Sequence, residues 1–234
     1  MHSIGLASTL YLALMLGLMP WMAFRSRRIM LGRAVDAAGT TTPVPTRTRI
    51  FASTLVSLAL VFWLSWITGR AFDFHPFALP HFGARSVVAA IGAFETQIAL
   101  MIVNRRFRSA AERRTMPVYK LMPRKPVEWM LYVSTAVAAG VAEETAYRGV
   151  LFSILWYGTG SPWVAVFVSA TAFAASHALQ GWKSTITIFL MALTMHALVW
   201  ATDTLLLAMV VHAVYDIVAG YIGARRVARG EVEG

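Results

Sequence analysis

Long apolar segments separated by short polar ones dominate this chain. Seven of the apolar segments are long enough to cross a hydrocarbon layer about 30 Å thick as helices. They are Ser3–Phe24, Ile50–Thr68, Ser86–Val103, Val127–Tyr157, Pro162–Leu179, Ser184–Thr202 and Thr204–Ala224. Because the backbone polar groups inside a bilayer must be satisfied within each segment, such segments form helices. The pattern predicts an all-α, polytopic membrane helix bundle of about seven transmembrane helices.

The first apolar segment is expected to be retained as a span. It lacks a positively charged region at its start, and it is followed by Arg25, Arg27 and Arg28 instead of a small-residue cleavage site. A secretory signal peptide would show the opposite features.

The basic residues alternate between the two sides of the predicted spans. The chain has 21 Lys and Arg, of which Arg148 lies inside an apolar segment. Eighteen others fall on one side and only Arg70 and Arg85 fall on the opposite side. Because positively charged loops remain cytoplasmic, this alternation predicts an N-terminus outside and a cytoplasmic C-terminus in a multi-pass protein of the cell membrane. The basic segment Arg105–Lys125 is expected to lie along the membrane surface and contact anionic lipid.

Composition narrows the function classes further. The chain is 58% hydrophobic and 14% charged, with a mean hydropathy of +0.61. Its net charge of +10 sits in short runs between apolar segments, whereas a nucleic-acid surface would carry basic residues along a polar face, so no nucleic-acid partner is expected. The absence of cysteine excludes disulfides and thiolate chemistry. Composition leaves the oligomeric state open.

Three regions are predicted along the chain. Residues 1–126 form three N-terminal transmembrane helices with basic cytoplasmic loops, which include a linker-like segment at 32–45. Residues 127–224 form a core of the last four predicted spans, and residues 225–234 form a basic cytoplasmic tail.

Three charged residues interrupt the apolar stretch from Trp129 to Trp156, namely Glu143, Glu144 and Arg148. A charge at the centre of a membrane helix costs roughly 2.5–3.5 kcal/mol, so these side chains must pair or line a wet cavity. Residues four apart share a helix face, and Glu144 and Arg148 are therefore predicted to form a structural ion pair. The side chain of Glu143 is rotated about 100° around the helix from that of Glu144. It is therefore predicted to stay outside the ion pair and to be free to take part in a reaction.

Two histidines follow at helical spacing. His177 lies four residues after Phe173, and His212 lies four residues before Asp216, which can accept from the imidazole and set its tautomer. Together with Glu143 these residues supply a base, two imidazoles and an orienting carboxylate, which is a catalytic set. Other polar residues in the spans, including Glu95 and His196, are expected to have structural roles.

The depths of the two key residues constrain the spans. At about 1.5 Å per residue, Glu143 lies roughly 24 Å from Val127, while His177 is two residues from the end of its segment. Glu143 and His177 can meet if the start of the fourth span projects from the hydrocarbon and the fifth span continues past Gln180. Both are expected.

The motifs Glu-Glu-x-x-x-Arg, Phe-x-x-x-His and His-x-x-x-Asp, in this order on successive apolar segments, resemble the CPBP intramembrane metalloproteases. That family comprises the type II CAAX prenyl endopeptidases and the ABI bacteriocin-immunity-like proteins. The resemblance covers about Val127 to Ala224. It implies an endopeptidase, a metallopeptidase by class, that hydrolyses a peptide bond in a membrane-associated protein or peptide of the prenylated CAAX type.

The resemblance also implies roles. Glu143 would activate a water, His177 would hold it, and His212 and Asp216 would stabilise the oxyanion. A carboxylate donates to an oxyanion only when protonated, so Asp216 as the orienter of His212 is the alternative. The cofactor is left open: His177, His212 and Glu143 could hold a divalent metal such as zinc with one position free for water, and a metal-free mechanism uses the same residues.

Two other functions remain compatible with the sequence. Buried Glu, His and Asp side chains also build the relays of proton- or ion-coupled transporters. A non-catalytic membrane immunity or scaffold protein could keep the same geometry and act by binding. Glu143→Gln separates binding from hydrolysis, because it should abolish only a proteolytic phenotype.

Overall fold

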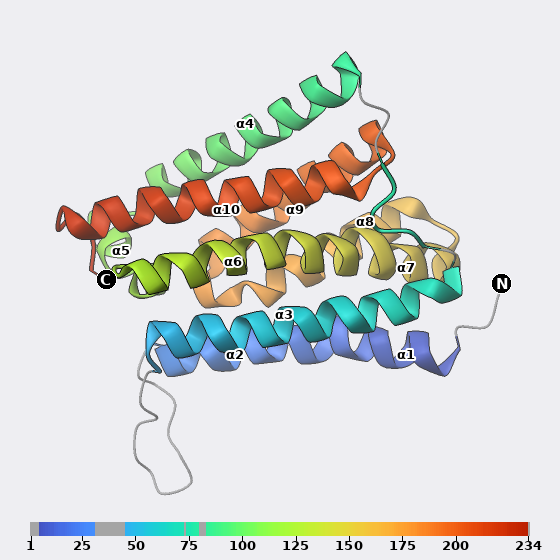
Figure 1. The fold of residues 1–234 in the computed structure, drawn as a ribbon, viewed down its shortest axis with the longest axis horizontal. Coiled ribbons are helices and arrows are strands. Elements are labelled where there is room, and N and C mark those ends of the chain that lie inside the picture. The colour runs from blue at the N-terminus through green and yellow to red at the C-terminus, as the bar shows by residue number, and fades with distance from the viewer. Residues whose placement is uncertain (1–4, 31–44, 73, 80–82, 234) are drawn as a thin grey trace, which may run out of the picture.

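The described part of the chain is helical throughout its regular elements. A computed structural model describes residues 5–30, 45–72, 74–79 and 83–233, and no strand occurs among them. The predicted all-α membrane bundle is confirmed (Figure 1). The start of the first predicted span and nearly all of the predicted linker at 32–45 lie outside the described residues.

Ten α-helices and five 3₁₀ or π segments follow one another along the described residues. In chain order they are α1 (Leu6–Ala13), η1 (Leu14–Leu18), α2 (Met19–Met30), α3 (Arg47–Gly69), η2 (Arg70–Phe72), α4 (Ala84–Arg106), α5 (Ala110–Arg114), η3 (Pro117–Leu121), α6 (Pro126–Glu143), η4 (Glu144–Leu151), α7 (Phe152–Thr159), α8 (Pro162–Ser176), η5 (Ala178–Gln180), α9 (Trp182–Thr202) and α10 (Leu205–Ala228).

Five helices among the described residues are long and apolar enough to cross a membrane. They are Leu6–Ile29, Arg47–Gly69, Ala84–Arg106, Trp182–Thr202 and Leu205–Ala228. The exact count of seven is not confirmed. The fourth predicted span is a continuous helical run formed by α6, η4 and α7, and it carries the charged residues of the motif. The fifth is α8, a shorter apolar helix of 15 residues.

The run α6–η4–α7 is the central element of the bundle. It packs against α3 on one side and α10 on the other, and α4 packs against α9 and α10; Figure 1 shows α3, α6, α10 and α4 in this order. α8 packs against α7 and α9, and α2 contacts α8 and η5. The three motif-bearing elements α6–η4, α8 and α10 are thus brought to one region.

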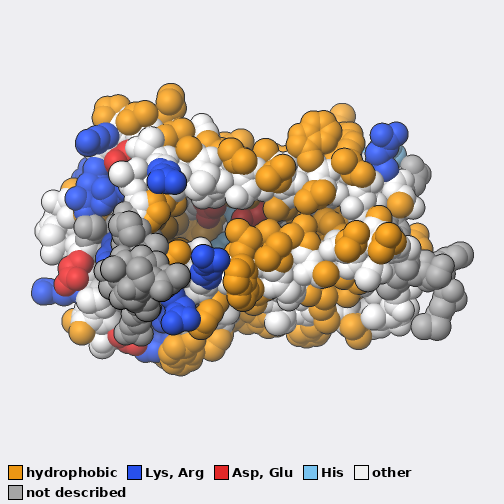
Figure 2. All heavy atoms as spheres, turned by 90° about the horizontal axis from the view of Figure 1, so that it is seen from below, with side chains coloured by type: hydrophobic (Ala, Val, Ile, Leu, Met, Phe, Trp, Pro, Cys, Tyr) orange, Lys and Arg blue, Asp and Glu red, His pale blue; other side chains and the backbone are white. Residues whose placement is uncertain are grey.

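Charge and apolar surface separate along the molecule. Figure 2 shows Lys and Arg side chains gathered at one end, where α3 and α6 begin and α4 and α10 end, with hydrophobic side chains covering the sides. Large hydrophobic residues of α3 and α4, such as Trp63, Ile67 and Val88, are exposed. Such a surface is stable against lipid and not against water. The chain is an integral, multi-pass membrane protein.

The expectation that the fifth span continues past Gln180 is wrong. α8 ends at Ser176, a 3₁₀ turn follows, and the chain reverses at Gly181, whose φ of +86° places it where glycine has no steric cost. α8 therefore stops part-way along the bundle. This early stop sets His177 at the level of Glu143, and no longer helix is needed.

The N-terminal helices are joined to the motif-bearing part of the chain. The hydroxyl of Tyr11 lies 2.7 Å from the Ser65 hydroxyl and donates to the Ala146 carbonyl at 3.2 Å. The Ser169 hydroxyl donates to the carbonyl of Tyr147 at 2.6 Å. Because a π segment shifts the backbone hydrogen-bond pattern to i→i+5, these donors from other helices stabilise the carbonyls of η4.

Candidate active site

The two motif carboxylates lie at a junction between two helix types. Glu143 is the last residue of α6 and Glu144 is the first residue of the π segment η4. π segments inside α-helices are frequent at functional sites because they change where successive side chains point. Here the change sends two adjacent carboxylates into different surroundings.

Glu144 is held in a buried polar network, in which its Oε2 and Nε of Arg148 have no hydrogen-bond partner among the described residues. Its side chain is fully buried, and its Oε1 lies 3.2 Å from Nη1 of Arg148, as the i,i+4 spacing predicts. The same Oε1 accepts a hydrogen bond from Nδ1 of His212 at 2.7 Å. The Arg148 guanidinium stacks 4.2 Å above the ring of Phe173. Every charged member of this network thus has a charged or aromatic partner.

The interpretation of Asp216 as the residue that orients His212 requires correction. Glu144 occupies that position, because its Oε1 accepts from the ring nitrogen Nδ1. Oδ2 of Asp216 lies 3.6 Å from Nε2, the other ring nitrogen. The spacing of four residues does bring Asp216 to the ring, but on the side that faces the cavity.

Glu143 lies on the open side of the site. Its Oε2 is 3.9 Å from Nε2 of His177 and 3.7 Å from Nε2 of His212, distances too long for direct hydrogen bonds. This oxygen is buried and has no hydrogen-bond partner among the described residues. Glu143, His177, His212 and Asp216, the four residues predicted as catalytic, therefore converge on one small volume.

The hydrogen bond of His177 fixes which of its nitrogens can accept. Its Nδ1 lies 2.9 Å from the carbonyl oxygen of Phe173. Since a carbonyl only accepts, Nδ1 carries the proton and a neutral ring leaves Nε2 with its lone pair. That lone pair is on the nitrogen nearest to Glu143. The Phe-x-x-x-His spacing thus sets the tautomer of the histidine.

The three predicted metal ligands stand farther apart than the ligands of a tetrahedral zinc site. Zinc ligands at about 2.0–2.1 Å stand about 3.3 Å from one another, whereas the separations from Glu143 are 3.7 and 3.9 Å. No group of three or more His, Asp or Glu within the described ranges is placed to hold a metal ion. In their present positions the residues do not fit the predicted zinc set of Glu143, His177 and His212.

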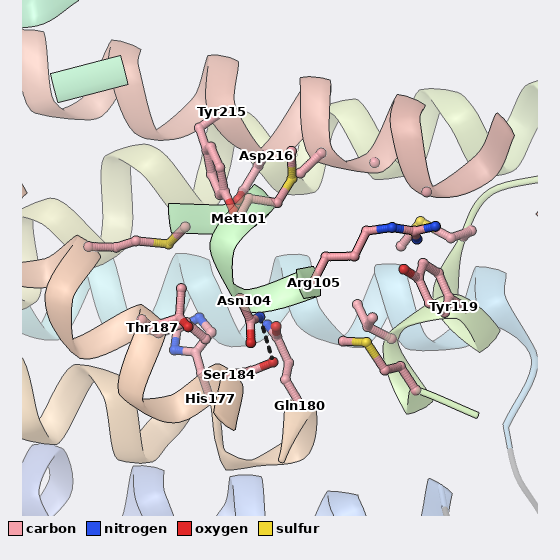
Figure 3. A pocket seen from close by; sticks show the side chains of 18 of the residues that line it. Met101, Asn104, Arg105, Tyr119, His177, Gln180, Ser184, Thr187, Tyr215 and Asp216 are labelled. Atoms are coloured by element: carbon pink, nitrogen blue, oxygen red, sulfur yellow. Dashed lines mark hydrogen bonds between the residues drawn. The ribbon is translucent and has the colours of Figure 1, made fainter. Parts of the chain in front are cut away.

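Two connected cavities lead to these residues. The inner one, of about 90 Å³, is lined by residues that include Glu144, Arg148 and His212. The outer one, of about 280 Å³, shares His177 and Asp216 with it and extends toward the basic end of the bundle. Figure 3 shows Asp216 in the upper part of the view and His177 below it, with Arg105 and Tyr119 farther to the right. In Figure 2, acidic and histidine atoms are visible in a hollow between hydrophobic side chains.

Gln97 is a polar residue of the site that sequence reasoning missed. It is buried on α4, donates from Nε2 to the Met191 carbonyl at 3.3 Å, and lines the inner cavity. Glu95, which drew attention because of its charge, is exposed instead. His196 is buried on α9 against the ring of Phe152. The sequence signal for Gln97 was its polar side chain inside the apolar segment Ser86–Val103, two residues after Glu95.

A close helix contact sets the register of the site. A Cβ on Gly140 would lie 2.6 Å from the Met209 carbonyl oxygen, so only glycine allows α6 and α10 to approach this far. Gly140 precedes Glu144 by one turn, and Met209 precedes His212 by about one turn. The contact therefore brings the Glu144 carboxylate within reach of the His212 ring.

Residues 125–218 match the family model described as type II CAAX prenyl endopeptidase Rce1-like. No curated protein and no solved structure matches the chain. The matched segment runs from the start of α6 into α10 and contains all six residues singled out from the motifs. The resemblance to the CPBP family is confirmed over this segment, and it supports a protease at the level of the family.

Proposed function

Since residues 125–218 match the Rce1-like family, we propose that the protein is an intramembrane endopeptidase in which Glu143 activates a water. The observation that carries this proposal is the pair of acceptors formed by Glu143 Oε2 and His177 Nε2, which lie 3.9 Å apart, with His177 lining the outer cavity. One water can reach both atoms at this separation. With both of its hydrogens accepted, the water presents an oxygen lone pair for attack.

The first step forms a bond between the water oxygen and the scissile carbonyl carbon. Glu143 takes one proton from the water as this bond forms, and His177 holds the other hydrogen in place. The proton on Glu143 then passes to the amide nitrogen as the carbon–nitrogen bond breaks. The same carboxylate thus acts first as base and then as acid, and the proton count closes.

His212 is the group placed to stabilise the developing oxyanion. Its Nε2 lies 3.7 Å from Glu143 Oε2, and its Nδ1 is fixed by Glu144 at 2.7 Å. When Nε2 carries a proton it donates to the oxyanion, and the Glu144 carboxylate balances the positive ring. Preorganised donors of this kind contribute about 10²–10³-fold to the rate.

The substrate we propose is a membrane-associated protein or peptide. A prenylated CAAX protein is the first candidate. It enters through the outer cavity, which extends toward the basic end of the bundle. By the positive-inside rule that end is cytoplasmic, with the N-terminus outside and the cell membrane as location. Exposed basic side chains such as Arg106 contact anionic lipid at this face.

Cleavage by the purified protein tests the proposal. Wild type in proteoliposomes is given a prenylated CAAX peptide and its unprenylated counterpart, and the products are identified by mass spectrometry. We expect hydrolysis by wild type and none by Glu143→Gln of equal thermal stability. Hydrolysis that persists in Glu143→Gln would refute the mechanism.

The same variant separates hydrolysis from a binding role. An immunity or scaffold protein with this geometry would keep its phenotype in Glu143→Gln, because the substitution preserves shape and removes only the base. A protease would lose its phenotype. The comparison is made in cells that express both proteins to the same level.

A further inference from the structure

The inner cavity is small, polar and next to the reaction centre. Its volume is about 90 Å³, and eight of its twelve lining residues carry polar side chains. It shares His177 and Asp216 with the outer cavity, so a small molecule held in it is close to the histidine that pairs with Glu143. At about 30 Å³ for each molecule, the volume holds about three waters.

The buried ion pair leaves polar atoms for such a molecule. Oε2 of Glu144 and Nε of Arg148 have no hydrogen-bond partner among the described residues, and both residues line the inner cavity. Their charges have opposite sign, so the pair favours neither an anion nor a cation. A neutral molecule that both donates and accepts suits these two groups, and polar cavities inside proteins hold water for this reason.

Gln97 adds a polar group from a helix outside the motifs. It is near the middle of the 23-residue helix α4, and α4 lies outside the matched segment 125–218. One amide hydrogen is donated to the Met191 carbonyl at 3.3 Å. The second amide hydrogen and the amide oxygen have no protein partner among the described residues. Gln97 therefore brings one donor and one acceptor to the wall of the inner cavity.

The reaction requires a local source of water. Hydrolysis consumes one water in each cycle, and the hydrocarbon around the bundle supplies none. A peptide in the outer cavity stands between the reaction centre and the basic end of the bundle. Gln97, Glu144 and Arg148 line only the inner of the two cavities. Water held by these three residues thus remains in place while a peptide is bound.

We propose that the inner cavity is a water-binding site that supplies the hydrolytic water, and that Gln97 holds water there together with Glu144 and Arg148. This inference rests on the proposed endopeptidase function and names the source of its water. The oxygen of the supplied water ends in the new carboxyl group of the product. Gln97 is a positioning residue, because it acts through the bound water and does not touch the peptide.

Radiolytic labelling detects bound water without relying on catalysis. A short X-ray pulse on the protein in nanodiscs converts water in place to hydroxyl radicals, which oxidise neighbouring methionines. Met195 lines the inner cavity and Met209 lines neither cavity, yet the two residues are equally buried, at 3% and 4% exposed. We expect peptide mass spectrometry to show Met195 oxidised several-fold faster than Met209. Equally slow oxidation of both methionines overturns the proposal.

Gln97→Leu tests the role of the amide. Leucine removes the donor and the acceptor with little change in size. We expect at least about a twofold slower oxidation of Met195 and a kcat about two- to tenfold lower, the value of one hydrogen bond. KM should not change, because Gln97 does not line the outer cavity.

A purely structural role of Gln97 predicts the opposite labelling. The amide also joins α4 to α9 through the Met191 carbonyl, and a helix pair that loosens admits water. Oxidation of both Met195 and Met209 would then rise in Gln97→Leu. That result overturns the assignment of Gln97 as a residue that holds water.

Thr96→Val is the matched control on the same helix. Thr96 is exposed, and its hydroxyl donates to the Gly92 carbonyl of α4 at 2.7 Å. We expect the oxidation of Met195 and kcat to stay at the values of wild type. Equal losses in Thr96→Val and Gln97→Leu would assign the effect to α4 as a whole and overturn the role of Gln97.

Failure of the proposed function gives a different result from failure of the water site. If Met195 is oxidised selectively and Gln97→Leu slows that oxidation, but wild type hydrolyses no peptide, the water site stands and the endopeptidase function fails. If wild type hydrolyses the peptide while Met195 and Met209 are oxidised alike, the function stands and the water site is wrong.

Discussion

Glu143 and Glu144 are identical residues next to each other in the chain, yet the structure gives them opposite surroundings. The side chain of Glu144 is 0% exposed and is fixed by Arg148 and His212. The side chain of Glu143 is 19% exposed and faces two histidine nitrogens across 3.7 and 3.9 Å. A buried carboxylate with an arginine and a histidine bound to one oxygen stabilises a structure, whereas a partly exposed carboxylate without a direct hydrogen bond can exchange a proton.

The strongest test of this comparison is Glu143→Gln. Removing a general base costs about 10²–10⁴-fold in rate, and we expect at least that loss in kcat. The melting temperature should stay within about 1–2 °C of wild type, since a partly exposed, unpaired carboxylate adds little stability. A peptide cleavage assay and thermal unfolding measure the two effects. Full activity here, with a specific loss in Glu144→Gln at normal stability, would reverse the two roles.

Arg148→Ala should act mainly on folding. It leaves the Glu144 carboxylate buried beside a single partner, His212, and breaking a buried pair costs about 3–5 kcal/mol. We expect low expression and a clearly lower melting temperature. The double variant Glu144→Gln/Arg148→Met removes both charges and should recover part of the stability. An Arg148→Ala protein as stable as wild type would contradict the assignment of a structural pair.

Gly140→Ala tests how the two environments are kept in register. The added methyl would meet the Met209 carbonyl at 2.6 Å, and overpacking of this kind costs about 1–3 kcal/mol. We expect reduced stability together with reduced activity, because α6 and α10 carry Glu144 and His212. Gly92→Ala is the matched control, since nothing lies within 4 Å of its Cβ. Equal behaviour of the two variants would remove the argument for the close contact.

Asp216→Asn should have the smallest effect. The carboxylate is 34% exposed on its side chain and lies 3.6 Å from His212 Nε2, outside hydrogen-bond range. Because Glu144 already fixes the ring, we expect less than about a tenfold change in kcat/KM and normal stability. A loss above about a hundredfold would place Asp216 among the groups that act in the reaction, as its position in the motif first suggested.

The sequence alone determined that the fold is a membrane helix bundle and that a cluster of charged residues interrupts its fourth apolar segment. Charges in apolar segments are too costly to be accidental, so Glu143, Glu144 and Arg148 could be identified without a structure. Helix periodicity also predicted the pairing of Glu144 with Arg148. These inferences concern single helices, where spacing along the chain fixes direction.

Only the tertiary structure decided which partners meet across helices. The π segment at Glu144 depends on donors from Tyr11 and Ser169, and it turns Glu144 toward His212. The end of α8 at Ser176, the inward position of Gln97 in place of Glu95, and the burial of Arg108 likewise depend on neighbouring helices. A local pattern fixes the spacing of side chains on one helix, but the face that a helix turns inward is set by what packs against it.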